Sequence, residues 1–286
     1  MSRRLSSMPQ LSHSIPDLVR SRVSTRGFSD RELEPEIRSA LADACRPMTS
    51  GLLKEKAEFR LADKPSEKGS RSKVTDYGFI TGARYYLWGV VEPSPLAYES
   101  YGYLMEHLVL KATDLGLQTC WLGYFHPEFL TGEAPRAEGV FPAAVIVGYG
   151  TDSWKGRLVR LAVQAARRKA WGRLFFLSDF KTPLSTAVCG VYAEALEMVR
   201  LAPSAGNLQP WRIVHEPARP AFHFYLRTMK AAYHDRHLHE VDIGIALCHF
   251  ELAARCRDLK GRWIIDDPGF SPPDPQTRYR LTWLGF

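Results

Sequence analysis

Two arginines flank a serine in the segment Arg22-Val-Ser24-Thr-Arg26, near the start of the chain. Alternate side chains of an extended segment point the same way, so both guanidinium groups and the hydroxyl can converge on one phosphate. Arginine suits this task better than lysine, because its planar fork of donors matches the geometry of phosphate oxygens. The same residues also fit a solvated basic segment that leads into a helix beginning near Leu33. On spacing alone, both interpretations stay open.

A second polar segment, Ala202-Pro-Ser-Ala-Gly-Asn-Leu-Gln-Pro-Trp211, follows a predicted helix over residues 186–201. Its prolines and its glycine end that helix and shape a turn, on which Ser204 and Asn207 place short polar groups. Backbone and amide groups presented in this way suit a flat polar ligand. A helix C-cap followed by a strand that starts near Trp211 explains the same residues without any ligand, so both interpretations stand.

The chain repeats itself at the offset that places Gly102 on Gly244; the repeat centres on a helix, and around it the offset drifts by several residues where the loops differ. From Gly102 to Leu117 apolar residues recur at intervals of three and four, which predicts one buried helix face. A chain that repeats one set of elements in this way is typical of two subunits fused into one. The matched pairs are Gly102 and Gly244, His107 and His249, Leu110 and Leu252, Ala112 and Ala254, Leu117 and Leu259, and Trp121 and Trp263.

Predicted strands stand before and after both copies of this helix, because aromatic and β-branched residues are concentrated there. We therefore expect an α+β fold in which two homologous halves pack as a pseudo-dimer within one chain. We place the first half at residues 16–165 and the second at residues 166–286. The predicted strands cover residues 85–91 and 143–148 in the first half, and residues 222–226 and 281–285 in the second.

Composition argues against several other classes of protein. The 286 residues are 45% apolar, enough for a large core, and no run of eighteen apolar residues could span a bilayer. The N-terminal segment lacks the apolar stretch of a secretory signal, so we expect a cytoplasmic protein without a membrane partner.

The five cysteines form no C-x-x-C pair and are expected as buried free thiols. A net charge of +7 would suit a polyanion, but the basic residues are scattered and no nucleic-acid motif is present.

The stretch from His234 to Glu240 contains three histidines, but its spacing fits no familiar zinc pattern and we expect no metal. Glu240 and Asp242 instead suit the N-terminus of the second core helix. No G-x-G-x-x-G or G-x-x-x-x-G-K-[ST] motif occurs in the chain. Neither a dinucleotide-binding Rossmann domain nor a P-loop is therefore predicted.

The turn at residues 202–211 resembles the hallmark of the FMN-dependent nitroreductases, a proline, serine and asparagine turn that ends in Gln-Pro-Trp. The arginine segment is similar to the Arg-x-Ser-x-Arg-x-aromatic arm of that family, with Phe28 as the aromatic residue. In that family one subunit gives the phosphate arm and its partner gives the turn beside the isoalloxazine ring. Ala205 replaces a residue that is often serine, which removes one possible contact. The resemblance implies phosphate contacts for Arg22, Ser24 and Arg26, and ring contacts for Pro203, Ser204, Ala205 and Asn207.

Two further segments are implied by the same resemblance. One is similar to the family segment that runs past the reactive N5 edge of the flavin, where a glycine allows close approach of the backbone, although a core turn would also explain it. The other is similar to a late basic pair that reaches the phosphate in many relatives, and the run Arg167–Lys169 competes for that role. The residues concerned are Leu122, Gly123 and Tyr124 in the first segment, and Lys155 and Arg157 in the second.

The two signature segments are divided between the halves. Only the first half has the arginine arm, and where the turn should lie it shows Arg46-Pro-Met-Thr-Ser50; the second half has the turn but no such arm near Lys181. The chain thus resembles the tandem-duplicated branch of the nitroreductase family. This resemblance implies a nitroreductase-like fold, one FMN per chain and a monomer, since the fused half already fills the dimer contact.

The function implied by the resemblance is hydride transfer. NADH or NADPH would reduce the bound FMN and leave, and a small organic acceptor would then take its place on the same face of the ring. No side chain is an obvious general acid, so protons would come from water. Two alternatives stay open: a flavin-consuming or dehalogenating enzyme of the same fold, and a flavin-binding or nucleic-acid-binding protein without turnover.

Overall fold

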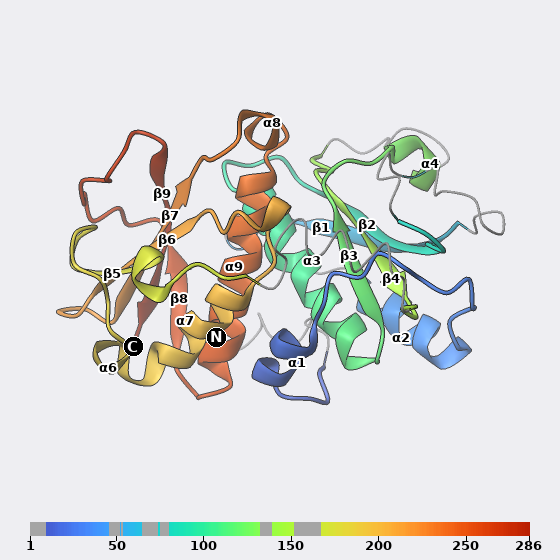
Figure 1. Ribbon diagram of the computed structural model, residues 1–286, viewed down its shortest axis with the longest axis horizontal. Helices are drawn as coiled ribbons and strands as arrows, with labels where there is room; N and C mark the ends of the chain where they lie inside the picture. Colours follow the sequence, from blue (N-terminus) through green and yellow to red (C-terminus); the bar gives the residue numbers. More distant parts are fainter. Residues whose placement is uncertain are drawn as a thin grey trace.

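The computed structural model describes residues 10–45, 52, 54–64, 74, 80–131, 139–151 and 167–286, and two β-sheets form its outer layers. In Figure 1 one sheet lies on each side of the molecule, and the long helices α3 (Ala97–Asp114) and α9 (Leu238–Arg255) lie between the sheets. Each half of the chain supplies one sheet and one of these helices. The predicted α+β fold of two homologous halves is confirmed.

The two sheets share one strand order. Their strands are β1 (Ala57–Asp63), β2 (Tyr85–Val91), β3 (Gln118–Leu122), β4 (Ala144–Gly148), β5 (Phe175–Leu177), β6 (Trp211–Glu216), β7 (Ala221–Arg227), β8 (Gly261–Ile264) and β9 (Thr277–Gly285). The antiparallel order β1-β2-β4-β3 of the first sheet recurs in the second as β6-β7-β9-β8, with β5 added as a parallel strand beside β6. The four strands predicted from the sequence correspond to β2, β4, β7 and β9.

The inner strands are apolar along most of their length, because helices or neighbouring segments cover them. All five residues of β4 are buried, as are six of the seven residues of β7. In the first sheet Leu87 pairs with Val145, and in the second Ile213 pairs with Phe224. β-Branched and aromatic side chains pack well on such pleated surfaces, which explains why the sequence pattern identified these strands.

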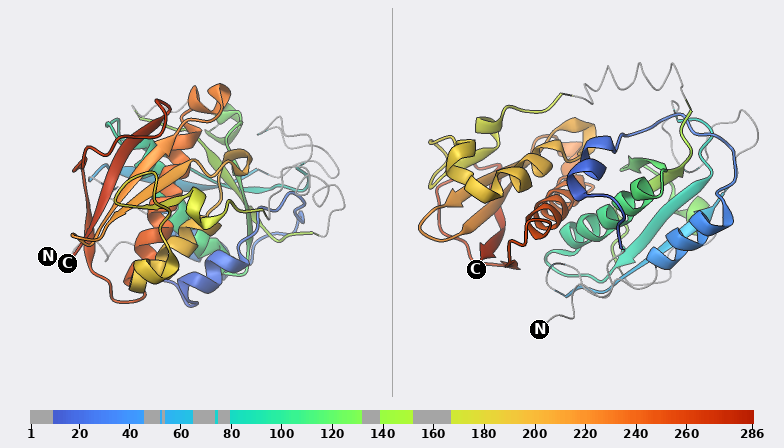
Figure 2. Two further views of the ribbon diagram at one scale, coloured as in Figure 1. Left: turned by 60° about the vertical axis from the view of Figure 1, so that its left-hand side comes forward. Right: turned by 90° about the horizontal axis from the view of Figure 1, so that it is seen from below.

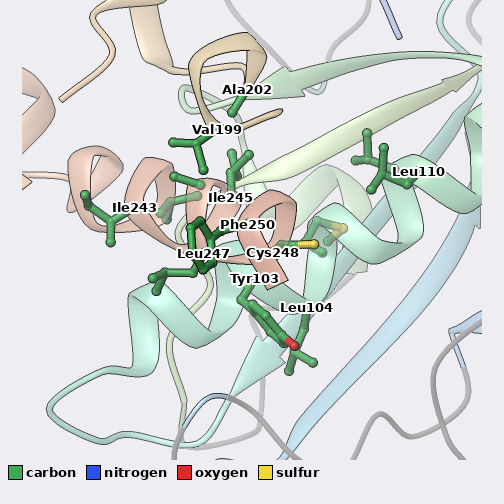
Figure 3. Packing of buried hydrophobic residues seen from close by; sticks show 14 of the residues in the cluster. Tyr103, Leu104, Leu110, Val199, Ala202, Ile243, Ile245, Leu247, Cys248 and Phe250 are labelled. Atoms are coloured by element: carbon green, nitrogen blue, oxygen red, sulfur yellow. The ribbon is translucent and has the colours of Figure 1, made fainter. Parts of the chain in front are cut away.

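Helices α3 and α9 cross where each carries a glycine of the repeat. A Cβ atom at Gly102 would lie 2.1 Å from the carbonyl oxygen of Val241, and one at Gly244 would lie 2.0 Å from that of Glu99. Glu99 and Val241 are themselves matched by the repeat offset, so the contact is reciprocal, as in a twofold dimer interface. Figure 2 shows the two helices side by side, and Figure 3 shows their buried apolar side chains packed together.

Shorter helices surround this pair. They are α1 (Ile15–Ser21), α2 (Pro35–Ala44), α4 (Pro127–Thr131), α6 (Thr186–Cys189), α7 (Ala193–Leu201) and α8 (Ala231–His234), with the 3₁₀ turns η1 (Trp171–Arg173), η2 (Gly190–Tyr192) and η3 (Ala205–Asn207). Ser14 caps α1 by accepting the N–H of Asp17 at 3.3 Å. Helix α1 packs against α3, α7 and α9, which places the start of the arginine segment beside both halves.

The structure differs from two expectations. The helix predicted over residues 186–201 is divided into α6, η2 and α7, because Gly190 has a φ of 54° and leaves the helical conformation. Four cysteines are buried free thiols as expected, but Cys256 at the end of α9 is exposed. No helix in the described ranges has the length and apolar character needed to cross a bilayer.

Candidate functional site

One pocket of about 470 Å³ lies between the two halves and is lined by both. The first half contributes the arginine segment and the end of β3, and the second contributes the turn at residues 203–207 and the start of α9. Segments that lie far apart in the chain therefore meet at one place. The predicted site residues that line the pocket are Arg22, Ser24, Arg26, Gly123, Pro203, Ser204, Ala205 and Asn207.

The arginine segment is extended because its backbone pairs with the edge of the first sheet. Ser24 forms a parallel bridge with Thr119 of β3, and the N–H of Thr25 donates to the carbonyl oxygen of Thr119 at 2.9 Å. Arg22 Nη1 donates to Ser24 Oγ at 3.5 Å, and Arg26 Nη1 donates to the Ser24 carbonyl oxygen at 3.3 Å. Both guanidinium groups thus gather around Ser24 on the pocket side, as the alternation predicts.

The turn at residues 203–207 is held in shape by its own hydrogen bonds. Ser204 Oγ accepts the N–H of Gln209 at 2.9 Å, and the N–H of Asn207 donates to the Ser204 carbonyl oxygen at 2.9 Å. Gly206 and Asn207 both have a φ of 56°, a left-handed conformation that glycine and asparagine adopt more readily than other residues. The turn is therefore preformed and does not need a ligand to take its shape.

Arg168 is a lining residue that sequence spacing could not separate from its neighbours. Its Nη1 donates to Asn207 Oδ1 at 3.1 Å, and its Nη2 donates to the Leu201 carbonyl oxygen at 3.0 Å. Burial, followed by repulsion from Arg22 and Arg200, lowers the pKa of Arg168 to about 10. The pocket therefore concentrates positive charge that an anionic group would neutralise.

The other cations proposed for this role are placed differently. Lys155 and Arg157 lie outside the described residues. In the run Arg167–Lys169, Arg168 lines the pocket, whereas Lys169 Nζ donates to two backbone carbonyl oxygens of the segment that follows the turn. The run of three basic residues indicated that one of them could contact the phosphate. Only the folded structure shows that Arg168 is the one that lines the pocket.

The segment after β3 reaches the pocket through its glycine. A Cβ atom at Gly123 would lie 2.6 Å from Cδ1 of Leu238, so glycine here lets the start of α9 approach the first half closely. Leu122 is fully buried in an apolar cluster, and Tyr124 donates its hydroxyl to the Ala232 carbonyl oxygen at 3.3 Å. Neither of these two side chains lines the pocket, and their contact with a flavin stays a prediction.

Tyr233 of α8 lines the pocket, and no sequence pattern pointed to it. Its ring stands edge-on to that of Tyr124, with centroids 6.2 Å apart. Arg236 lies over the Tyr124 ring at 4.2 Å and Lys230 over the Tyr233 ring at 5.4 Å, and both cations are exposed. We call these four residues the rim; it adds aromatic and positively charged groups beside the pocket.

The histidines around the start of α9 take part in local contacts. His234 Nδ1 and His237 Nδ1 lie 3.9 and 3.8 Å from Glu240 Oε1, and His239 is fully buried. In the part of the chain that the structure describes, no three His, Cys, Asp or Glu side chains are grouped so as to hold a metal ion.

Comparison with known proteins identifies the family. The profile of a family described as putative TM nitroreductase matches residues 14–254, which include both the arginine segment and the turn. The chain belongs to this family. The resemblance drawn from those two segments is thereby confirmed, and membership of the TM nitroreductase family supports an oxidoreductase of the nitroreductase type. No curated protein matches the chain.

A solved structure of a nitroreductase shares the fold. A putative nitroreductase from Thermotoga maritima is 19% identical to this TM nitroreductase family member, with a TM-score of 0.59 and coverage of 96% of this chain and 95% of that chain. At this identity the likeness concerns the fold, and the predicted nitroreductase-like fold is confirmed. A nitroreductase from Bacteroides fragilis with bound FMN is 14% identical, with a TM-score of 0.38 and coverage of 50% of this chain and 91% of its own.

Proposed function

We propose that the protein is an FMN-dependent oxidoreductase that carries hydride from NADH or NADPH to a small organic acceptor. The observation that supports this most directly is the pocket in which the arginine segment of one half faces the turn of the other. When bound, FMN would supply the isoalloxazine ring that accepts and returns hydride. The role of the protein itself would be to bind the cofactor, to orient its ring and to exclude water from it.

The cationic side of the pocket fits a phosphate group. Arg22 and Arg26 gather around Ser24, and Arg168 lies close enough to Arg22 for their charges to repel. A phosphate between them would replace this repulsion with attraction. Each charge-assisted hydrogen bond to it would contribute about 1.5–3 kcal/mol. The gathering of Arg22, Arg26 and Arg168 on one side of the pocket thus supports an anionic ligand at this end.

The remainder of the pocket suits a flat aromatic ring. Apolar side chains of Leu201, Val241 and Ile245 line it near the turn. Cofactor sites commonly combine apolar walls with a few convergent polar groups, which keep water away from the ring and fix its orientation. Because the turn at residues 203–207 is held by internal hydrogen bonds, it would bind the ring without first having to become ordered.

The same proposal covers the dinucleotide that donates hydride and the oligomeric state of the protein. Arg236 and Lys230 of the rim place positive charge where an anionic dinucleotide would approach the ring. The second half supplies the turn, which a partner subunit supplies in two-subunit nitroreductases. We therefore propose a monomer with one FMN per chain, whose partners are small molecules.

The purified protein tests the proposal through its colour. It should be yellow, and the pigment released on denaturation should be FMN in about equal amount to the protein. NADH or NADPH should bleach the flavin absorbance, and a nitroaromatic or quinone acceptor should restore it. A colourless preparation that refuses added FMN would contradict the proposal. Bound flavin without oxidation of NADH or NADPH would indicate a flavin-binding protein, and loss of the flavin itself would indicate a flavin-consuming enzyme.

A further inference from the structure

Asp242 lies near the start of α9 and lines the pocket, although its side chain is only 5% exposed. Its carboxylate accepts the N–H of Ala205, at 2.9 Å to Oδ1 and 3.1 Å to Oδ2. Ala205 is the central residue of the turn that the proposed function assigns to the flavin ring. This contact links a buried carboxylate directly to the backbone of the proposed ring site.

The repeat provides an internal comparison for this contact. Asp242 corresponds to Ser100 at the repeat offset. Ser100 Oγ likewise accepts the N–H of a loop residue, Leu52, at 3.1 Å, and it donates to Glu55 Oε2 at 2.7 Å. Both core helices thus tether a loop at the same position. The half whose turn lines the pocket does so with an acidic side chain, and the other half does so with a hydroxyl group.

We propose that Asp242 is a positioning residue whose negative charge fastens the turn, so that the pocket holds FMN less tightly when this carboxylate takes up a proton. A carboxylate oxygen accepts an N–H more strongly than a neutral carboxylic acid does. With a weaker tether, residues 203–207 would be held less firmly in the geometry that the ring requires. The inference rests on the proposed function, because it takes FMN as the ligand of the pocket.

His239, one turn earlier on α9, faces this carboxylate, with Nδ1 at 3.8 Å from Asp242 Oδ2. Its Nε2 accepts the N–H groups of Met229 and Lys230 at 3.3 and 3.4 Å. The proton of the neutral ring is therefore on Nδ1, on the side of the carboxylate. The other titratable or charged groups around Asp242 are Glu240, Tyr233 and, lining the same pocket, Arg22, Arg26 and Arg168.

The balance of these neighbours sets the pH at which the tether changes. Burial raises the pKa of Asp242 to about 6, against the opposing effects of His239 and of the Ala205 N–H, and Glu240 adds to the rise. The carboxylate is therefore ionised at neutral pH and protonated in mildly acidic solution. Both states can be reached while the protein is folded and handled in ordinary buffers.

The test compares the affinity for FMN of wild-type and variant proteins at two pH values. Cofactor-stripped protein is titrated with FMN, whose fluorescence reports binding, at about pH 7.5 and about pH 5. Asp242→Asn keeps an oxygen acceptor for Ala205 but removes the charge. We expect it to raise the Kd about five- to tenfold relative to wild type at the higher pH and less than twofold at the lower. Titration of the FMN phosphate cancels in this ratio.

Two further variants complete the test. Asp242→Ser introduces the residue type of the first half and should reproduce the pH-dependent ratio if the asparagine variant does not fold. Ser100→Ala is the matched control at the other tether, and its ratio to wild type should be the same at both pH values. Ratios independent of pH in both Asp242 variants, or a pH-dependent ratio in Ser100→Ala, would overturn the inference. Failure of the wild type to bind FMN at either pH would instead contradict the proposed function.

Discussion

The two halves of the chain share a scaffold, and they differ at the positions that line the pocket. Helices α3 and α9 each have 18 residues and cross through reciprocal glycine contacts. Val241 and Ile245 of α9 line the pocket, but their counterparts in α3 are Glu99 and Tyr103. Glu99 does not line the pocket and instead accepts a hydrogen bond from Arg280 Nε at 2.5 Å. The position of an apolar lining residue in one half is therefore occupied in the other by a buried acid, which pairs with Arg280 across the halves.

This difference teaches that packing and ligand chemistry constrain a duplicated fold unequally. The glycines at the crossing must be kept in both copies, because each one contacts the backbone of the opposite helix. The site chemistry has to survive in only one copy. At the counterpart position, burial raises the pKa of Glu99 to about 7 despite the pairing with Arg280, so that position carries a partly titrating acid rather than a surface for an aromatic ring.

A substitution at the helix crossing should destabilise the protein whichever half carries it. Gly102→Ala and Gly244→Ala would each place a Cβ atom within about 2.1 Å of a carbonyl oxygen of the other helix. We expect each variant to lose about 3 kcal/mol of unfolding free energy, measured by urea denaturation. Gly148→Ala is the control, because its Cβ would meet only Phe28 Cδ1 at 3.5 Å. If only one of the two helix variants is destabilised, the crossing is not reciprocal.

The difference in site chemistry is tested most strongly at the phosphate end. Arg26→Ala removes one of the guanidinium groups that gather around Ser24. The Kd for FMN should rise about tenfold to a hundredfold, because a charge-assisted contact contributes about 1.5–3 kcal/mol. Arg262→Ala, at an exposed position on β8 of the second sheet, is the control and should bind FMN as the wild type does. An unchanged affinity in Arg26→Ala would mean that the phosphate lies elsewhere.

The two tethers should also differ in how they affect stability. The folded protein retains the proton of Asp242 up to about pH 6, whereas in the unfolded chain the pKa returns to its ordinary value of 3.8. Stability that this group contributes in acid is therefore lost as the pH rises through that window. The difference in unfolding free energy between Asp242→Asn and wild type should therefore shift by about 2 kcal/mol in favour of the variant when the pH rises from about 4.5 to about 7.5.

Urea denaturation at several pH values would measure this gain. Ser100→Ala provides the reference, because its hydroxyl does not titrate and its difference from wild type should stay constant. A constant difference for Asp242→Asn as well would show that Asp242 titrates in the folded protein as it does in the unfolded chain.

The smallest expected effect is on the KM for the dinucleotide and concerns Arg236 of the rim, which has no arginine counterpart in the first half. Arg236 corresponds to Ser94 at the repeat offset. If the dinucleotide approaches over the rim, Arg236→Ala should raise the KM for NADH and NADPH about two- to fivefold, the loss expected from one exposed cation. Steady-state kinetics should show little change in kcat. A fall in kcat at constant KM would place Arg236 in a different role, and Arg262→Ala again serves as the control.

The elements and motifs that depend on contiguous residues could be predicted without coordinates. The strand at residues 85–91 coincides with β2, and the alternation of Arg22, Ser24 and Arg26 places all three on the pocket side. The strand follows from its concentration of aromatic and β-branched residues, and the placement of the arginine segment follows from the period of two in an extended chain; both are local properties of the sequence. The helix break at Gly190 could not be predicted in the same way, because a single glycine within an apolar pattern does not reveal its φ angle.

The sequence by itself determined that this chain has two halves, an arginine arm in one and a polar turn in the other, because repeats and short motifs are written in residue order. Only the tertiary structure decided that arm and turn share a pocket, that Arg168 joins them, and that Asp242 tethers Ala205. The physical reason is that these contacts join residues from distant parts of the chain. Their formation depends on the crossing of α3 and α9, which local spacing does not record.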